Sequence, residues 1–141
     1  FHHLLDPAAT LAEMVRVCRP GGRVLVRDVS PSREKVDAYD AIETLRDPSH
    51  THALTREEFA ALGAGLPVNA PELFEQTISD VPIDAILASS FPELCTIDDL
   101  RTQFMTDATG GRDELGFSAV LVEGKVRVTL PLIIARWDLS F

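Results

Sequence analysis

The stretch MVRVCRPGGRVLVRDV, from Met14 to Val29, decides the fold class. Its first part continues an apolar stripe at helical spacing, made of Leu11, Met14, Val15 and Cys18. Pro20-Gly21-Gly22 then ends the helix abruptly. In the next segment Val24 and Val26 face one way and Leu25 faces the other, which predicts a strand covered on both sides, as in a parallel sheet with flanking helices. The stretch therefore predicts a layered α/β fold with a tight connection from helix to strand.

The flanking sequence predicts the remaining helices and strands. Asp6-Pro7 places an N-cap acid before a proline at the first helical position, and Thr55 to Glu58 is a capping box that opens a later helix. Glu123-Gly124 supplies a hairpin turn, and Pro131 predicts a bulge or a sheet edge. We expect further helices over residues 32–46, 83–90 and 96–110, and strands over 73–81, 117–122 and 126–137.

Composition excludes several classes of function. The 141 residues suit one domain, and the net charge of -9 disfavours binding to the phosphates of nucleic acids. No apolar run reaches the roughly 20 residues that a membrane helix needs, and no signal-peptide pattern opens the chain. Cys18 and Cys95 are too few for a disulfide scaffold and fit no zinc motif. We therefore expect a cytoplasmic protein without nucleic-acid or membrane partners.

Several segments carry a resemblance to a known family: Phe1 to Pro7, Leu11 to Met14, Arg16 to Gly22, and Arg23 to Asp28. Together they resemble the second half of a class I S-adenosylmethionine-dependent methyltransferase, in the small-molecule branch that includes ubiquinone and menaquinone methyltransferases. The helix, the Arg-Pro-Gly-Gly turn and the strand that ends in Asp are among the more specific signatures of that family. The loop from Asp47 to Thr55 is similar to a loop of one subgroup. The residues from Leu132 to Trp137 are similar to the family's last, antiparallel strand.

The resemblance implies a Rossmann-like sheet of which Val24 to Asp28 is the fifth strand. The expected fold class is α/β: the C-terminal part of a methyltransferase sheet with flanking helices and a C-terminal antiparallel hairpin. In the family a glycine-rich turn after the first strand receives the cofactor, and an acid that ends the second strand binds its ribose. Gly63-Ala64-Gly65 follows a helix and lacks a third glycine, so it reads as a helix terminator. We expect residues 1–141 to be a single domain equivalent to the C-terminal half, without the N-terminal cofactor-binding half.

The function that the resemblance implies is methyl transfer from S-adenosylmethionine to a small-molecule acceptor in the intact form of the protein. The chain alone is then expected to bind the cofactor weakly or not at all. A second hypothesis is a non-catalytic interaction module, because a truncated sheet has an unpaired edge that favours self-association or completion by an N-terminal half in trans. A third is the product of a degraded gene or of a start-site error.

The resemblance also nominates site residues. Phe1 and His2 would flank the cofactor, and His2 and His3 would lie where the methyl group meets the acceptor, with His3 as the catalytic residue; the alternative is a loop that leads into the first helix, or a disordered chain terminus. Asp28 either faces the pocket at the end of its strand or caps the Ser30-Pro31 turn. His50 either contacts substrate in a closing loop, binds a metal, or is solvated.

Other conspicuous residues have simpler interpretations. His52 shares the three alternatives of His50, and no third ligand cluster supports a metal. The pair Asp98-Asp99 reads as N-terminal helix charge rather than a catalytic dyad. Trp137 and the phenylalanines read as core.

Overall fold

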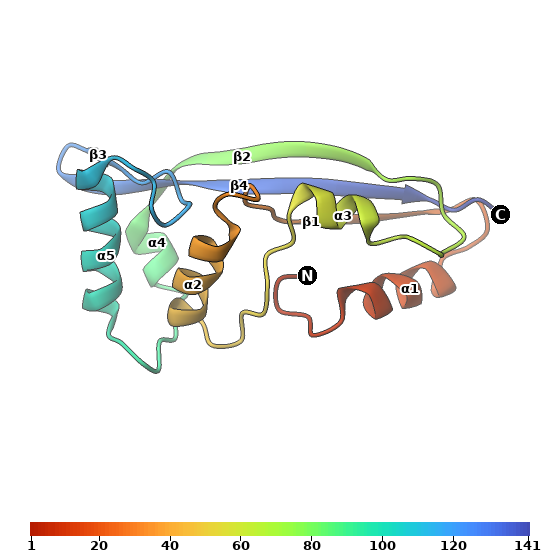
Figure 1. Ribbon diagram of the computed structural model, residues 1–141, viewed down its shortest axis with the longest axis horizontal. Helices are drawn as coiled ribbons and strands as arrows, with labels where there is room; N and C mark the ends of the chain where they lie inside the picture. The colour runs from red at the N-terminus through yellow and green to blue at the C-terminus, as the bar shows by residue number, and fades with distance from the viewer.

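The computed structural model describes all residues from Phe1 to Phe141 (Figure 1). Its elements are α1 (Pro7–Val17), β1 (Arg23–Val29), α2 (Val36–Arg46), α3 (Arg56–Ala61), β2 (Glu72–Pro82), α4 (Ile83–Leu87), α5 (Ile97–Gly110), β3 (Val120–Val122) and β4 (Lys125–Asp138). In Figure 1 the sheet is seen nearly edge-on, with α1, α2, α4 and α5 on the same side of it. The N-terminal segment lies between α1 and α2 on that side.

The long strand β4 is the centre of the sheet. The strand order is β1-β4-β2, and β3 pairs with the start of β4 through a hairpin. Every pairing is antiparallel, with Val26 opposite Ala135 and Phe74 opposite Ile134. The other edges of β1 and β2 therefore have no strand beside them. The C-terminal antiparallel hairpin that the sequence predicts is confirmed.

The expectation that β1 is covered on both faces in a parallel sheet is wrong for this chain. Exposed and buried residues alternate along β1, and Leu25 is 54% exposed. On the same outer face Leu25 lies opposite Arg136, and Phe74, on the far side of β4, is 48% exposed. The reason is that helices cover the inner face only (Figure 1). Apolar residues on both faces of β1 predict that both faces are buried, but the helices of this chain cover only one of them.

The Pro-Gly-Gly turn has a steric explanation. Helix α1 begins as predicted, because Asp6 accepts a hydrogen bond from the Ala9 amide and proline occupies the first helical position. At Gly21 φ is +68°, a left-handed conformation that favours glycine. A Cβ atom at Gly22 would lie 2.8 Å from the Arg19 carbonyl oxygen, so this second position also requires glycine.

The other helices are confirmed with shifted ends. Thr55 opens α3 and Thr96 opens α5, each through a capping box. In the second box Asp99 accepts hydrogen bonds from Thr96, which confirms that this acid supports a helix start. Helix α2 begins at Val36, later than predicted, because residues 32–35 form turns. Strand β3 is also shorter than predicted, since Phe117 is buried before the strand begins.

Pro131 lies inside the central strand, and neither a bulge nor an edge marks it. The bulge lies on β2 instead, between Ile78 and Val81. The Pro131 carbonyl accepts a hydrogen bond from the Ser30 amide, so the side of Pro131 that lacks an N–H faces the point where β1 has already ended. Ser30 follows the last residue of β1, so the proline removes at most the final hydrogen bond of this pairing, and the central strand tolerates it.

Two hydrophobic clusters pack against different halves of β4. Val126 and Val128 join the cluster with α2, α4 and α5, whereas Ile133, Ala135 and Trp137 join the cluster with α1, β1 and α3. The buried positions change from even to odd between Val128 and Ile133, beside the bulge of β2. Trp137 is fully buried, which confirms its assignment to the core, but Phe74, Phe91 and Phe141 are exposed, so the assignment of all the phenylalanines to the core is wrong. No helix of the chain has the length and apolar character needed to cross a bilayer.

Candidate functional site: imidazoles held by carboxylates

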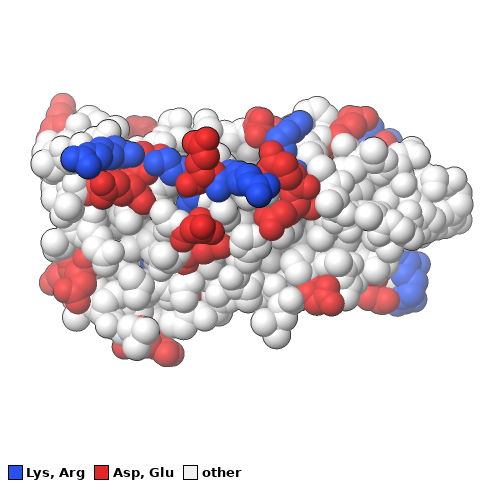
Figure 2. All heavy atoms as spheres, viewed as in Figure 1, with Lys and Arg blue, Asp and Glu red and all other residues white.

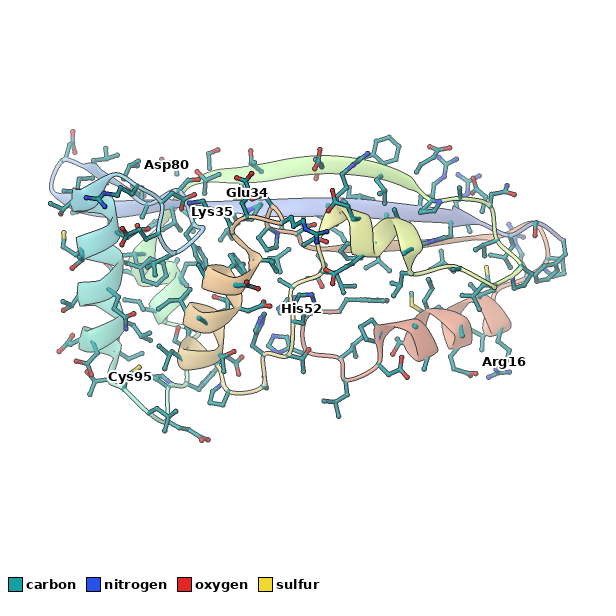
Figure 3. The ribbon with its side chains drawn as sticks, in the orientation of Figure 1. Arg16, Glu34, Lys35, His52, Asp80 and Cys95 are labelled. Atoms are coloured by element: carbon teal, nitrogen blue, oxygen red, sulfur yellow. The ribbon has the colours of Figure 1, made fainter.

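The N-terminal segment is bound to the loop that follows α2. The backbone N–H and the hydroxyl of Thr51 each donate to the carbonyl oxygen of His2, both at 2.8 Å. The same hydroxyl lies 3.0 Å from the carbonyl oxygen of Leu4. Figure 3 shows His52 where this loop passes the N-terminal segment in the middle of the molecule. These contacts bring residues far apart in sequence to one place.

Asp28, at the end of β1, holds the first imidazole. Its Oδ1 lies 2.5 Å from His2 Nδ1, and its Oδ2 lies 2.9 Å from both the backbone nitrogen of His2 and that of Phe1. Burial raises the pKa of the Asp28 carboxyl, but hydrogen bonds from His2 and Phe1 outweigh it and lower the pKa to about 2. Asp28 is therefore ionised at neutral pH. It binds the N-terminal segment and makes no cap for the Ser30-Pro31 turn.

Asp40, on α2, holds two further imidazoles. Its Oδ1 lies 2.7 Å from His50 Nε2 and accepts from the Ala53 amide, and its Oδ2 lies 2.6 Å from His52 Nδ1. Burial raises the pKa of Asp40, but these hydrogen bonds from Ala53, His50 and His52 outweigh it and lower the pKa below its ordinary value. The carboxylate of Asp40 therefore stays charged and faces three donors.

His52 is itself held between two carboxylates. Its Nε2 lies 3.0 Å from Glu58 Oε2, opposite the contact with Asp40. Burial lowers the pKa of His52, whereas hydrogen bonds to Asp40 and Glu58 outweigh it and raise the pKa above its ordinary value. His52 is 39% exposed and borders a surface hollow of about 460 Å³, together with Arg33 and Thr55.

His3 is fixed through a serine. Its Nδ1 lies 2.9 Å from Ser49 Oγ, and this hydroxyl donates to Asp47 Oδ1 at 2.7 Å. The ring centroids of His2 and His3 are 4.2 Å apart, and those of His2 and His50 are 5.7 Å apart. We call His2, His3 and His50 the histidine cluster. No group of His, Cys, Asp or Glu residues in the chain has the geometry to hold a metal ion.

The structure brings all five predicted site residues into direct contact or close proximity, since the backbone nitrogen of Phe1 also contacts Asp28. His2, His3, Asp28 and His50 meet as described, and Phe1 packs 6.5 Å from Phe59, centroid to centroid. The His50 side chain is 0% exposed, so the solvated alternative for it is wrong. None of the surface hollows is lined by Phe1 or His2. Their assignment to cofactor binding stays a prediction, as do the catalytic assignments of His3, Asp28 and His50.

Sequence reasoning missed Asp40, Ser49 and Glu58. Only Asp40 had a visible signal. It lies four residues after Val36, on the apolar face of α2, where an acid needs a partner if it is not solvated. The partners themselves follow from the path of the loop between α2 and α3, which no periodicity predicts.

The surface charges do not form one extended basic area on the face shown in Figure 2. There most of the Lys and Arg side chains lie in a row along the upper part of the molecule, with acidic side chains directly beside them, and a further basic group lies at the lower right. This arrangement agrees with the acidic balance of the sequence. It gives a nucleic-acid backbone no continuous cationic surface on that face.

Comparisons with known proteins place the fold. No protein-family model matches the chain. A stretch of 63 residues is 40% identical to the uncharacterised Escherichia coli K12 protein YafE and covers 43% of this chain and 30% of YafE. The crystal structure of Bacillus subtilis YcgJ superposes with a TM-score of 0.78 at 19% identity, covering 99% of this chain and 60% of YcgJ.

A second solved structure leads to the same fold. It is that of BH2331, a candidate methyltransferase of Bacillus halodurans, with a TM-score of 0.69 at 22% identity, covering 97% of this chain and 59% of BH2331. The chain thus spans less than two thirds of the length of each protein that it matches. The chain therefore has the methyltransferase-like fold of these two structures and matches about three fifths of each.

Proposed function

We propose that this chain is the acceptor-side part of a methyltransferase that moves a methyl group from S-adenosylmethionine to a small molecule. The observation that carries the proposal is the histidine cluster at the carboxyl end of β1 in a methyltransferase fold. In open α/β sheets, ligands bind beyond the carboxyl ends of the strands. His3 is exposed there and His2 is partly exposed, so a small molecule can contact both rings.

The residues of this chain do not by themselves fit S-adenosylmethionine. The two residues assigned to it, Phe1 and His2, line no hollow, and Phe1 packs against Phe59 instead. When bound, the cofactor supplies an electrophilic methyl group. A part of the fold that lies outside the matched region would hold it, either in the same polypeptide or in a partner.

Two measurements test this proposal. Isothermal titration of the chain with S-adenosylmethionine is expected to show no binding in the micromolar range. Micromolar binding would contradict the acceptor-side assignment, because the chain would then contain its own cofactor site.

The natural protein that includes this chain is the material for the second measurement. Given S-adenosylmethionine with a labelled methyl group and a mixture of small metabolites, it is expected to label a small-molecule product. Replacing His3 by Ala is expected to reduce the labelling, and Glu34→Gln, an exposed charge that makes no hydrogen bond or ion pair, serves as the control. A folded protein that binds the cofactor and labels only protein or nucleic acid would refute the small-molecule assignment.

A second candidate function is a self-associating interaction module. The specific observation in its favour is the outer face of the sheet, where Leu25 of β1 and Phe74 of β2 are exposed and the outer edge of β1 has no strand beside it. Exposed apolar surfaces of this kind mark interaction sites. Light scattering is expected to report a dimer or larger species that Leu25→Glu dissociates. A monodisperse monomer with a sharp thermal transition would refute self-association.

A further inference from the structure

We infer that the histidine cluster is a proton-accepting site for a small molecule whose methylated atom carries a proton, and that Asp28, Ser49 and Asp40 position its three rings. The inference deepens the proposed function and rests on it. Its basis is geometric: each of the cluster's rings is bound through one nitrogen to a negatively charged network, and the other nitrogen of each ring makes no hydrogen bond within the chain.

The hydrogen-bond partners assign the tautomer of each ring. An ionised carboxylate only accepts hydrogen bonds, so the proton lies on His2 Nδ1 toward Asp28 and on His50 Nε2 toward Asp40. The Ser49 hydroxyl donates its hydrogen to Asp47 Oδ1, so its oxygen accepts a hydrogen bond from His3 Nδ1. In the neutral state the bare nitrogens are therefore Nε2 of His2, Nε2 of His3 and Nδ1 of His50.

The buried ring provides an independent reason to infer a function. His50 is fully enclosed, and its Nδ1 has no hydrogen-bond partner. A buried nitrogen without a partner destabilises the fold, so its presence calls for an explanation. A base that must be free to take up a proton satisfies this requirement, because a permanent partner would block the nitrogen.

The layout of the rings separates two roles. His3 and His2 lie toward the surface and are the rings that a ligand can touch. His50 lies behind them, with its ring centroid 5.7 Å from that of His2 and 6.1 Å from that of His3. Asp40 touches no ligand in this arrangement. It orients His50, and its negative charge favours an imidazolium in the neighbouring His2 or His3 ring, whereas Asp28 is the carboxylate bonded directly to an exposed ring, that of His2.

The chemical step is a proton transfer. The bond between hydrogen and the methylated atom of the small molecule breaks, and its electron pair stays on that atom as the nucleophilic lone pair. The proton forms a new N–H bond with the bare nitrogen of an exposed imidazole, and the resulting imidazolium later returns the proton to water. This chemistry selects an oxygen, nitrogen or activated carbon acid over an acceptor that has no proton to lose.

Charged groups from every neighbouring element face the cluster and set its pH response. They are Asp28 from β1, Asp40 from α2, Asp47 and His52 from the loop after α2, and Glu58 from α3. His52 shares the Asp40 carboxylate with His50, so protonation of His52 competes for the same negative charge.

Nitrogen-15 NMR of the imidazoles tests the inference on the chain itself. At about pH 8, above the ordinary histidine pKa, we expect a protonated Nδ1 in His2 and His3 and a protonated Nε2 in His50. Asp40→Asn is expected to turn His50 into a mixture of tautomers, whereas His52→Gln leaves it unchanged. Ser49→Ala is expected to turn His3 into a mixture of tautomers. Because Ser49 lies in an exposed loop, this variant still tests the inference if the Asp40 variant unfolds. A protonated Nδ1 in His50 of the unsubstituted chain would overturn the inference.

The pH dependence of methyl transfer by the natural protein supplies the second readout. Asp40→Asn is expected to lower kcat by about 10²-fold and to move the acid limb of the profile, while Asp40→Glu restores part of both. A loss of activity with an unchanged profile would mean that Asp40 is only structural. If no methyl transfer is found but the tautomers are as expected, the proposed function is wrong, whereas the assignment of a fixed tautomer to each imidazole is confirmed. If transfer is found with other tautomers, the inference alone fails.

Discussion

Replacing Asp40 by Asn should destabilise the fold measurably. The carboxylate accepts hydrogen bonds from His50, His52 and the Ala53 amide at 2.6 to 2.9 Å, and its side chain is only 20% exposed. Charge-assisted hydrogen bonds contribute about 1.5–3 kcal/mol each. The asparagine oxygen keeps one or two of these donors, and the partly exposed His52 can turn to water. The expected loss in the free energy of unfolding is therefore about 2 kcal/mol at neutral pH.

Thermal and urea unfolding followed by circular dichroism measure this loss. For a domain of about 150 residues, 2 kcal/mol corresponds to a fall in Tm of about 4–8 °C. Glu34→Gln, which removes an equal charge from an exposed position without partners, is the matched control and should change stability by less than about 0.5 kcal/mol. If the Asp40 variant unfolds at the same temperature as the control, the carboxylate does not hold the loop and Asp40 has no positioning role.

The same variant has a defined pH signature. The pKa of Asp40 is lowered, so its contribution is present above the unfolded value near 3.8 and is lost as pH falls through the folded pKa. The pKa of His52 is raised, so its contribution is present below the unfolded value near 6.5 and is lost as pH rises through the folded pKa. The stability difference between the wild type and the Asn variant should therefore be largest between these values and shrink on both sides.

Three further substitutions test other contacts. Asp28→Asn should cost about 2 kcal/mol above pH 4 and speed amide exchange in residues 1–5; because the folded pKa of Asp28 is about 2, the loss should vanish as pH falls toward that value. Gly22→Ala should cost about 1–3 kcal/mol in urea unfolding, because its Cβ would meet the Arg19 carbonyl; an unchanged midpoint would refute this contact. Gly63→Ala should cost a similar amount, because its Cβ would lie 2.7 Å from Trp137 Nε1, and near-ultraviolet circular dichroism should report the displaced indole.

The elements with local signals could be predicted from the sequence, and those that depend on distant contacts could not. Asp6, Thr55 and Thr96 cap their helices as predicted, because a cap is satisfied within three residues of itself. The prediction of a bulge or an edge at Pro131 was wrong, because whether the sheet tolerates a proline there depends on where β1 ends, a hundred residues earlier in the chain. Leu25 was predicted to lie on a covered face because an apolar residue in a strand indicates burial, but this chain leaves its side chain exposed.

The site divides in the same way. His2, His3 and His50 were nominated from a resemblance and from their residue type, and the structure adds what holds each ring. That support comes from Asp40 and Ser49, whose importance is invisible in sequence because each acts across a loop. An acid on an apolar helix face and a serine in a polar loop are common, and only the folded path of residues 47–53 turns them into partners of histidines.

Strand β1 joins the site to the uncovered face of the sheet. Its inward residues Val24 and Val26 anchor the core and lead to Asp28, whereas Leu25 points out on the opposite side. A partner segment that covers Leu25 or pairs with the free edge would hold the strand that carries the Asp28 carboxylate. Covering that face should therefore slow amide exchange at His2 and Val29, both of which donate backbone hydrogen bonds to Asp28. If those amides exchange equally fast with and without the partner, the outer face and the histidine cluster are energetically independent.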